Sequence, residues 1–233
     1  MIINDTQVQT LIEALPYLRD FKDKTIVVKY GGNAMLNDQI KNKVLQDVVF
    51  LQCAGMRPVV VHGGGPEITA MLMQAGKKSE FVSGLRVTDA ESVGIAEMAL
   101  VGKINTDLVA RLNTLGGRAV GLNGKDANLV QAKKHLADVY ENGEVNLVDI
   151  GYVGNVEHVN TDLIEVLLAN GFIPVIAPTG VGSSGETYNI NADTAAARIA
   201  AELGAENLVL MTDIVGLLED KDDDSTLIPT VQV

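Results

Sequence analysis

Three segments of the chain combine a short apolar run with an amphipathic run of helical length. TIVVKYGGNAM precedes DQIKNKVLQDVVFLQCAG, RPVVVHGGG precedes PEITAMLMQAG, and FIPVIAPTG follows TDLIEVLLANG. The apolar runs hold β-branched residues at successive positions, so both faces of each strand are apolar. Such strands, separated by helices, form a parallel sheet with both faces covered. The sequence therefore predicts an α/β fold with a mostly parallel, open sheet sandwiched by helices.

A separate amphipathic helix is predicted before the first strand. Its apolar residues follow the i, i+3, i+4, i+7 spacing of a helix: Val8, Leu11, Ile12 and Leu15. A helix outside the strand and helix alternation must bury this stripe either on its own domain or on another subunit. We therefore expect residues 1–21 to form a helical extension, for which oligomerisation is one of two explanations.

Two further units are predicted in the middle of the chain. Residues 88–117 have the pattern of one long helix, which Thr88 or Asp89 can cap. After it, LVQAKK and NLVDIGYVGNVEHV have the pattern of short strands on either side of a polar turn at Asn142 and Gly143. We expect these strands to be a small antiparallel addition to the main sheet.

A boundary between two lobes is predicted near the Gly- and Ser-rich stretch at 177–189, which has the composition of a flexible loop or hinge. The first lobe would cover residues 22–180. The second would begin at 181–233, where one helix and one convincing strand are found.

Composition limits the partners. The formal net charge of −12 repels nucleic-acid phosphates and anionic lipid headgroups, so nucleic acid and membranes are not expected as partners. The single cysteine, Cys53, lies in an apolar run and is interpreted as a small buried hydrophobe. No signal peptide and no run of 18 apolar residues is found. We expect a cytoplasmic protein.

Two glycine clusters follow two of the predicted strands. Gly31 and Gly32 come after TIVVKY, and Gly63, Gly64 and Gly65 come after RPVVVH. Parallel strands end at one edge of a sheet, so both clusters should lie there. Their backbone N–H groups, with a helix N-terminus behind the second cluster, can bind an anion. Either cluster alone also suits a tight turn, but two on one edge favour an anion site.

Lys29 lies near the end of the first strand, two residues before its glycines. A lysine on an otherwise apolar strand either reaches an anionic partner or extends into water. The neighbouring glycines favour the anionic partner.

Familiar nucleotide-binding, hydrolytic and metal motifs do not fit. Ile68 occupies the third glycine position of a dinucleotide fingerprint, GVGSSG does not open a helix, and GLNGKD lacks the Ser or Thr of a P-loop. The three histidines have no metal-ligand spacing, and no Gly-x-Ser-x-Gly is present. No protein-held metal or hydrolytic triad is predicted.

Six segments, taken in order, resemble one known family: VVKYGGNAM, VVVHGGGPEI, GLRVTD, VGKIN, NINADTAA and LVLMTDIVGLL. Together they are similar to the amino-acid kinase superfamily and, through GLRVTD and NINAD, to its N-acetyl-L-glutamate kinases of arginine biosynthesis. The resemblance implies that ATP, bound with Mg²⁺, phosphorylates the side-chain carboxylate of N-acetyl-L-glutamate. It also implies an N-terminal acceptor lobe and a C-terminal nucleotide lobe. The acceptor carboxylate is already ionised, so catalysis rests on positioning and electrostatic stabilisation rather than on a general base.

The resemblance assigns roles at the phosphoryl group. Lys29 would neutralise its charge and Asp193 would orient the catalytic lysines. Gly31, Gly32 and Gly63 would donate backbone N–H groups to it.

The resemblance also assigns the acceptor contacts. Gly64 and Gly65 would hold the acceptor, and Arg86 would bind its α-carboxylate with two parallel hydrogen bonds. Asn189 would hydrogen-bond the acceptor, whereas Asn191 either joins the site or caps the following helix.

The segment TDIVGLL is implied to contact ATP through four residues: Thr212, Asp213, Gly216 and Leu217. Asp213 and Gly216 would be nearest the phosphates or ribose, although an Asp here also suits a turn. The family pattern continues for some tens of residues past STLIPTVQV and includes a second catalytic lysine. A chain that ends at Val233 is therefore expected to bind ATP weakly and to turn over little, or not at all.

Two other functions stay open. Glutamate 5-kinase also forms an acyl phosphate, although Arg86 and Asn189 argue against it. A binding or regulatory module that retains N-acetylglutamate without turnover would fit the missing second lysine. The N-terminal helix resembles the extension of the arginine-sensitive, hexameric members, which implies a homo-oligomer, a dimer or a hexamer, with L-arginine as feedback inhibitor.

Overall fold

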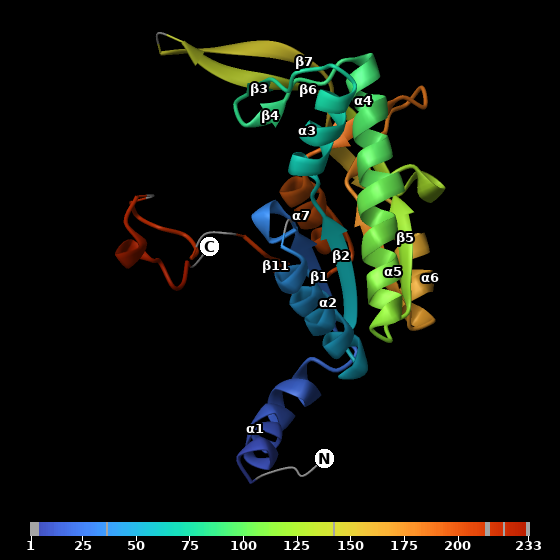
Figure 1. The fold of residues 1–233 in the computed structure, drawn as a ribbon, viewed down its shortest axis with the longest axis vertical. Helices are drawn as coiled ribbons and strands as arrows, with labels where there is room; N and C mark the ends of the chain where they lie inside the picture. Colours follow the sequence, from blue (N-terminus) through green and yellow to red (C-terminus); the bar gives the residue numbers. More distant parts are fainter. Residues whose placement is uncertain (1–4, 36, 142, 213–214, 221, 232–233) are drawn as a thin grey trace.

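The computed structural model describes residues 5–35, 37–141, 143–212, 215–220 and 222–231. Its centre is a five-stranded sheet in the order β11-β1-β2-β8-β5, in which all neighbouring strands run parallel (Figure 1). The strands are β1 (Thr25–Tyr30), β2 (Arg57–His62), β5 (Ala119–Asn123), β8 (Ile173–Ala177) and β11 (Asn207–Leu210). The predicted mostly parallel α/β sheet is confirmed.

Helices cover both faces of this sheet. They are α2 (Asp38–Cys53), α3 (Gly65–Gln74) and α5 (Thr106–Thr114) on one face, and α6 (Asp162–Ala169) and α7 (Ala192–Glu202) on the other. Successive side chains of a strand point to opposite faces, and β2 divides accordingly. Val60 packs in the core with α2, α3 and α5, whereas Val59 and Val61 pack in the core with α6 and α7.

The predicted long helix is present as three consecutive parts: α4 (Ala90–Glu97), η2 (Met98–Asn105) and α5. Its N-cap is Asp89, whose carboxylate accepts a hydrogen bond from the Ser92 N–H at 2.7 Å. Thr88, the other candidate, is fully buried, and its hydroxyl donates to the Arg86 carbonyl. The η2 segment is a π-helix, a wider turn that often occurs at functional sites.

The predicted antiparallel strands do not join the main sheet. They are longer than expected and close a small barrel with two short strands. The four are β6 (Val130–Glu141), β7 (Glu144–Val159), β9 (Thr179–Val181) and β10 (Thr187–Ile190). Glycines permit the closure, because a Cβ on Gly154 would lie 2.6 Å from the Tyr188 Cβ. The outer half of β6 and β7 projects as an arm (Figure 1), and Asn142 lies outside the described residues.

The Gly- and Ser-rich stretch expected to be a flexible loop or hinge forms the β9–β10 hairpin instead, with Tyr188 paired to Gly180. The helix and strand expected for a second lobe, α7 and β11, lie on the central sheet, where β11 pairs with β1 at its edge. The boundary expected after Gly180 therefore falls inside β9. The division into an acceptor lobe and a nucleotide lobe stays a prediction.

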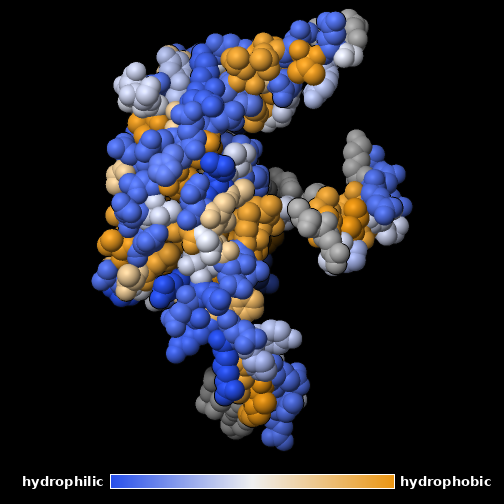
Figure 2. Space-filling model, turned by 180° about the vertical axis from the view of Figure 1, so that it is seen from behind, coloured by the Kyte–Doolittle hydropathy of each residue, from blue (hydrophilic) through white to orange (hydrophobic). Residues whose placement is uncertain are grey.

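The N-terminal helix forms as α1 (Asp5–Asp20), but the chain does not bury its apolar stripe. Val8, Leu11, Ile12 and Leu15 are between 44% and 60% exposed, and Figure 2 shows apolar side chains on the surface of this helix. Burial on its own domain, one of the two explanations, is therefore wrong.

Cys53 is exposed, contrary to expectation, because the buried stripe of α2 ends one turn earlier at Val49. Among the described residues, no helix is long and apolar enough to cross a membrane.

Candidate active site

The two glycine clusters meet at the carboxyl edge of the sheet, as the sequence predicts. Tyr30 and His62 are paired in the β1–β2 register, so the clusters start side by side. A Cβ on Gly31 would lie only 3.6 Å from the Cα of Gly63. A cavity of about 270 Å³ opens here, and all five predicted glycines line it.

Lys29 reaches an anionic partner at one end of this cavity. Its ammonium lies 3.0 Å from the Asp193 carboxylate, with side chains that are 12% and 52% exposed. Asp193 stands in the first turn of α7. A Cβ on Gly31 would lie 3.2 Å from Cε and 3.3 Å from Nζ of Lys29. The missing side chain of Gly31 thus leaves room for the lysine to bend toward Asp193.

Gly63 does not match the role expected of it. Its N–H donates to the Tyr30 carbonyl at 2.7 Å. The β1–β2 ladder continues one residue past His62, and this hydrogen bond takes the N–H that was expected to face a phosphoryl group.

Gly64 is the N-cap of α3, and no side chain of the described residues caps this helix. The first N–H groups of a helix have no intrahelical partner. A Cβ on Gly64 would lie 2.6 Å from the terminal methyl carbons of both Leu100 and Ile104. Gly64 therefore lets η2 pack close against the start of α3.

Arg86 stands at the other end of the cavity, on a short hairpin of β3 (Phe81–Val82) and β4 (Leu85–Arg86). Ser83 and Gly84 join the strands with positive φ angles of 49° and 78°. A two-residue turn of this hand matches the twist of the strands, and it points the following residues back toward the glycines.

The guanidinium of Arg86 is held by neutral groups. It donates to the Gly65 carbonyl at 3.0 Å, to the Thr69 hydroxyl at 2.9 Å and to the Ser79 hydroxyl, and it stacks on the Phe81 ring at 4.7 Å. The residue is 7% exposed, and burial lowers the pKa of Arg86 below its ordinary value. Since a buried cation needs an opposite charge, the arrangement is suited to an anionic ligand.

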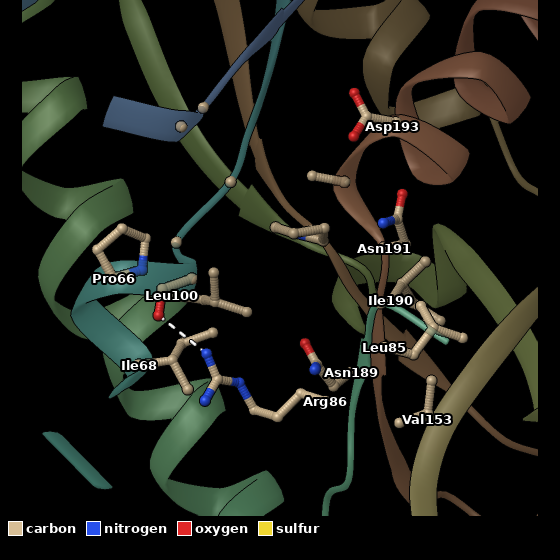
Figure 3. A pocket seen from close by; sticks show the side chains of 18 of the residues that line it. Pro66, Ile68, Leu85, Arg86, Leu100, Val153, Asn189, Ile190, Asn191 and Asp193 are labelled. Atoms are coloured by element: carbon tan, nitrogen blue, oxygen red, sulfur yellow. Dashed lines mark hydrogen bonds between the residues drawn. The ribbon is translucent and has the colours of Figure 1, made fainter. Parts of the chain in front are cut away.

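The chain from β10 into α7 supplies the rest of the cavity wall. Figure 3 shows the Asn189 amide beside the Arg86 side chain, with Asn191 and Asp193 farther along the cavity. The Asn191 side chain accepts a hydrogen bond from the Thr194 N–H at 3.0 Å. Asn191 therefore both caps α7 and lines the cavity, so the two explanations are compatible.

Comparisons with known proteins agree with this geometry. The Amino acid kinase family matches residues 24–233. The chain belongs to the amino acid kinase family. As a member it is a phosphotransferase, and its edge of backbone N–H groups and cations is suited to that chemistry.

Within the family, two similar proteins carry the name acetylglutamate kinase. The one from Moorella thermoacetica is 55% identical, over 96% of this chain and 75% of its own length. The one from Pelotomaculum thermopropionicum is 54% identical, over 95% of this chain and 76% of its own length. Among solved structures, N-acetylglutamate synthase from Neisseria gonorrhoeae, complexed with coenzyme A and N-acetyl-glutamate, is 27% identical with a TM-score of 0.76. That match covers 92% of this chain and 47% of the synthase.

The predicted ATP contacts are not brought to the cavity. Thr212, Gly216 and Leu217 come after β11 and are absent from the described residues that line the cavity. Figure 1 shows the last segment of the chain projecting away from the sheet. Gly216 has a φ of 148° and packs against Leu227, and Leu217 is 66% exposed. Asp213 lies outside the described residues, and the ATP contacts of this segment stay predictions.

Sequence reasoning missed the residues that hold Arg86 in place, namely Thr69, Ser79 and Phe81. Thr69 follows Gly65 by one helical turn, a spacing that places both on one side of α3 and that was available in the sequence. His62 was also missed. It was treated as one of three scattered histidines, although it directly precedes the glycines. His62 is completely buried beside Gly63 and Asn105.

Proposed function

We propose that this amino acid kinase transfers the γ-phosphoryl group of ATP to the side-chain carboxylate of N-acetyl-L-glutamate, which yields N-acetyl-L-glutamyl 5-phosphate. The identity of more than half of the aligned residues with two acetylglutamate kinases supports the choice of acceptor. The observation that carries the proposal is one cavity with Arg86 near one end and Asp193, the ion-pair partner of Lys29, near the other.

At the acceptor end, Arg86 would bind the α-carboxylate, and Asn189 would hydrogen-bond the acceptor. Apolar side chains that line the same cavity, including Ile68 and Leu100, suit the methylene groups of the acceptor. Of the described residues that line the cavity, only Asp193 is acidic, and Lys29 already pairs with it. A free α-ammonium group would therefore lack a counter-ion, whereas an N-acetylated amine carries no charge. This supports N-acetyl-L-glutamate over L-glutamate.

At the phosphoryl end, Lys29 would neutralise the transferring group, and Asp193 would hold the lysine in place. Gly31, Gly32 and Gly64 would donate backbone N–H groups, while Gly65 would let the backbone approach the acceptor. The described residues contain no group of three metal-ligating side chains, so Mg²⁺ would arrive on the ATP phosphates. When bound, the ion supplies further neutralisation of phosphate charge.

Trapping of the acyl phosphate with hydroxylamine tests the proposal. The protein is incubated with Mg²⁺ and ATP and, separately, with N-acetyl-L-glutamate, L-glutamate and N-acetyl-L-aspartate. We expect hydroxamate from N-acetyl-L-glutamate alone. Equal hydroxamate from L-glutamate would contradict the assigned acceptor. Binding of N-acetyl-L-glutamate with no hydroxamate would instead favour the binding module.

We further propose a cytoplasmic homo-oligomer, either a dimer or a hexamer, that L-arginine inhibits. The exposed stripe of α1 supports assembly, and the family resemblance supports arginine. Deletion of residues 1–20 should lower the particle mass in light scattering, and an unchanged mass would contradict a role of α1. Turnover with and without L-arginine tests the inhibition.

A further inference from the structure

Two polar side chains are buried beside the glycine cluster that follows β2. His62 is 0% exposed and Asn105 is 5% exposed, and the flanking residues of β2 are buried valines. Apolar side chains would satisfy a sheet interior at lower cost, since buried polar groups must find hydrogen-bond partners. The proposed reaction does not use either side chain directly, so their burial needs another explanation.

The hydrogen bonds of Asn105 determine the tautomer of His62. The Asn105 amide nitrogen lies 2.8 Å from the Val175 carbonyl, which can only accept, and 3.1 Å from Nε2 of His62. The Leu122 carbonyl lies farther from the same nitrogen, at 3.4 Å. Because an amide nitrogen donates and does not accept, Nε2 is the acceptor of the 3.1 Å contact, and the imidazole proton is on Nδ1. Nδ1 then donates to the Gly63 carbonyl at 2.9 Å. Burial lowers the pKa of His62 to about 4, which keeps the ring neutral at pH 7.

This hydrogen bond fixes the peptide between Gly63 and Gly64. In a trans peptide the carbonyl and the following N–H point in opposite directions. A Gly63 carbonyl held toward His62 therefore turns the Gly64 N–H to the opposite side. On the preceding peptide, the Gly63 N–H is held by Tyr30. Two glycines in sequence would otherwise allow this peptide to rotate easily.

The π-helical segment η2 contributes both Asn105 and the side chains that pack beside Gly64. Asn105 is its last residue, and Leu100 and Ile104 of the same segment pack against Gly64. The sheet makes room for the amide, because a Cβ on Gly121 would collide with the Asn105 side-chain oxygen. His62 therefore holds the carbonyl of Gly63, and the side chains of Leu100 and Ile104 limit the space beside Gly64.

We propose that His62 and Asn105 are positioning residues that hold the Gly63–Gly64 peptide with the Gly64 N–H directed toward the bound anion. The inference rests on the proposed kinase function for its catalytic consequence. The hydrogen-bond geometry itself does not depend on which acid is phosphorylated.

Two polar substitutions of His62 separate positioning from support of the fold. In His62→Asn the side-chain nitrogen can occupy the place of Nδ1 and still donate to Gly63. In His62→Gln the longer side chain can reach Asn105 but not the Gly63 carbonyl. We expect His62→Asn to keep kcat/KM for N-acetyl-L-glutamate within about threefold of wild type, and His62→Gln to lose about tenfold or more. The KM for ATP should change little in either variant.

If His62 only stabilised the fold, the two substitutions would change the melting temperature but would not give different kcat/KM values. Equal kcat/KM values for the two folded variants would therefore overturn the proposal.

A second measurement uses the unaltered protein, in case a variant fails to fold. Imidazole ¹⁵N NMR should show the proton of His62 on Nδ1, and a proton on Nε2 would overturn the geometry. If wild type forms no hydroxamate from N-acetyl-L-glutamate, the proposed function fails, while the NMR result still decides on the positioning pair.

Discussion

The two ends of the cavity hold their cations in different ways. At the end proposed to bind the acceptor, Arg86 is 7% exposed and is held by three neutral oxygens and an aromatic ring. At the end proposed to bind the phosphoryl group, Lys29 forms an ion pair with Asp193, whose side chain is 52% exposed. One cation is fixed by its surroundings, and the other is attached to a carboxylate that water reaches.

This difference fits two different tasks. A carboxylate that is bound and released unchanged is best held by a rigid, planar group. A phosphoryl group moves during transfer, so its cation must follow the charge. An ion pair whose carboxylate is half exposed is weak enough to rearrange. We therefore expect substitutions at the Arg86 end to raise KM and substitutions at the Lys29 end to lower kcat.

The largest expected effect is that of Lys29→Met. Loss of the cation should lower kcat by about 10³-fold, because charge on the transferring group would lose its neutralisation. The KM for N-acetyl-L-glutamate should change little. Steady-state hydroxamate formation measures both values. Lys24→Met is the matched control, since Lys24 also forms an ion pair, with Glu206, but its side chain is 48% exposed and it is not among the described residues that line the cavity. A rise in KM with an unchanged kcat would reverse the comparison.

The sheet could be predicted from the sequence because its signal is local. The β-branched runs of β1, β2 and β8 are apolar on both faces, and each has a helical segment beside it in sequence. The barrel could not be predicted in this way. Its closure depends on Gly154 and Gly180 meeting side chains from strands far away in the sequence, and such glycines look like ordinary loop residues.

The site was predictable to a similar extent. Lys29 and the glycines follow strands, so parallel topology alone places them together. The spacing of Gly65 and Thr69 could be read from the sequence, but no spacing relates either residue to Arg86. His62 and Asn105 likewise come from separate elements. The Gly63 N–H was misassigned because the β1–β2 ladder continues one residue past the predicted strand end. Residue type does not reveal that extension.

Between the two ends, Gly64→Val should have the next largest effect. Its Cβ would lie 2.6 Å from Leu100 and Ile104, and the added methyl groups would push η2 away from α3. We expect N-acetyl-L-glutamate binding to weaken by about 100-fold, the equivalent of about 3 kcal/mol, which is within the usual range for overpacking. Isothermal calorimetry measures the affinity, and circular dichroism checks the fold. Gly102→Val is the control, because its Cβ meets open space. Normal binding by Gly64→Val would remove Gly64 from the site.

A smaller effect is expected for Arg86→Lys, which tests the rigid end directly. Lysine keeps the charge but loses the planar pair of donors and the stacking on Phe81. We expect the KM for N-acetyl-L-glutamate to rise about 30-fold, with kcat nearly unchanged. Arg118→Lys is a close control, since Arg118 also stacks on a phenylalanine, at 4.2 Å from the Phe172 ring, but lies outside the cavity lining. Equal KM values for the two variants would show that Arg86 only supports the hairpin.

The smallest effect is expected for Gly31→Ala, and it tests whether the Lys29 end is adaptable. The new Cβ would approach Cε and Nζ of Lys29 to 3.2 and 3.3 Å. Because these atoms end a flexible side chain, the lysine can shift without disturbing the sheet. We expect kcat to fall only about fivefold, the equivalent of roughly 1 kcal/mol, with the melting temperature unchanged. Gly94→Ala, whose Cβ meets open space, is the control. A loss as large as that of Lys29→Met would mean that the lysine cannot adjust, and the two ends would then be equally rigid.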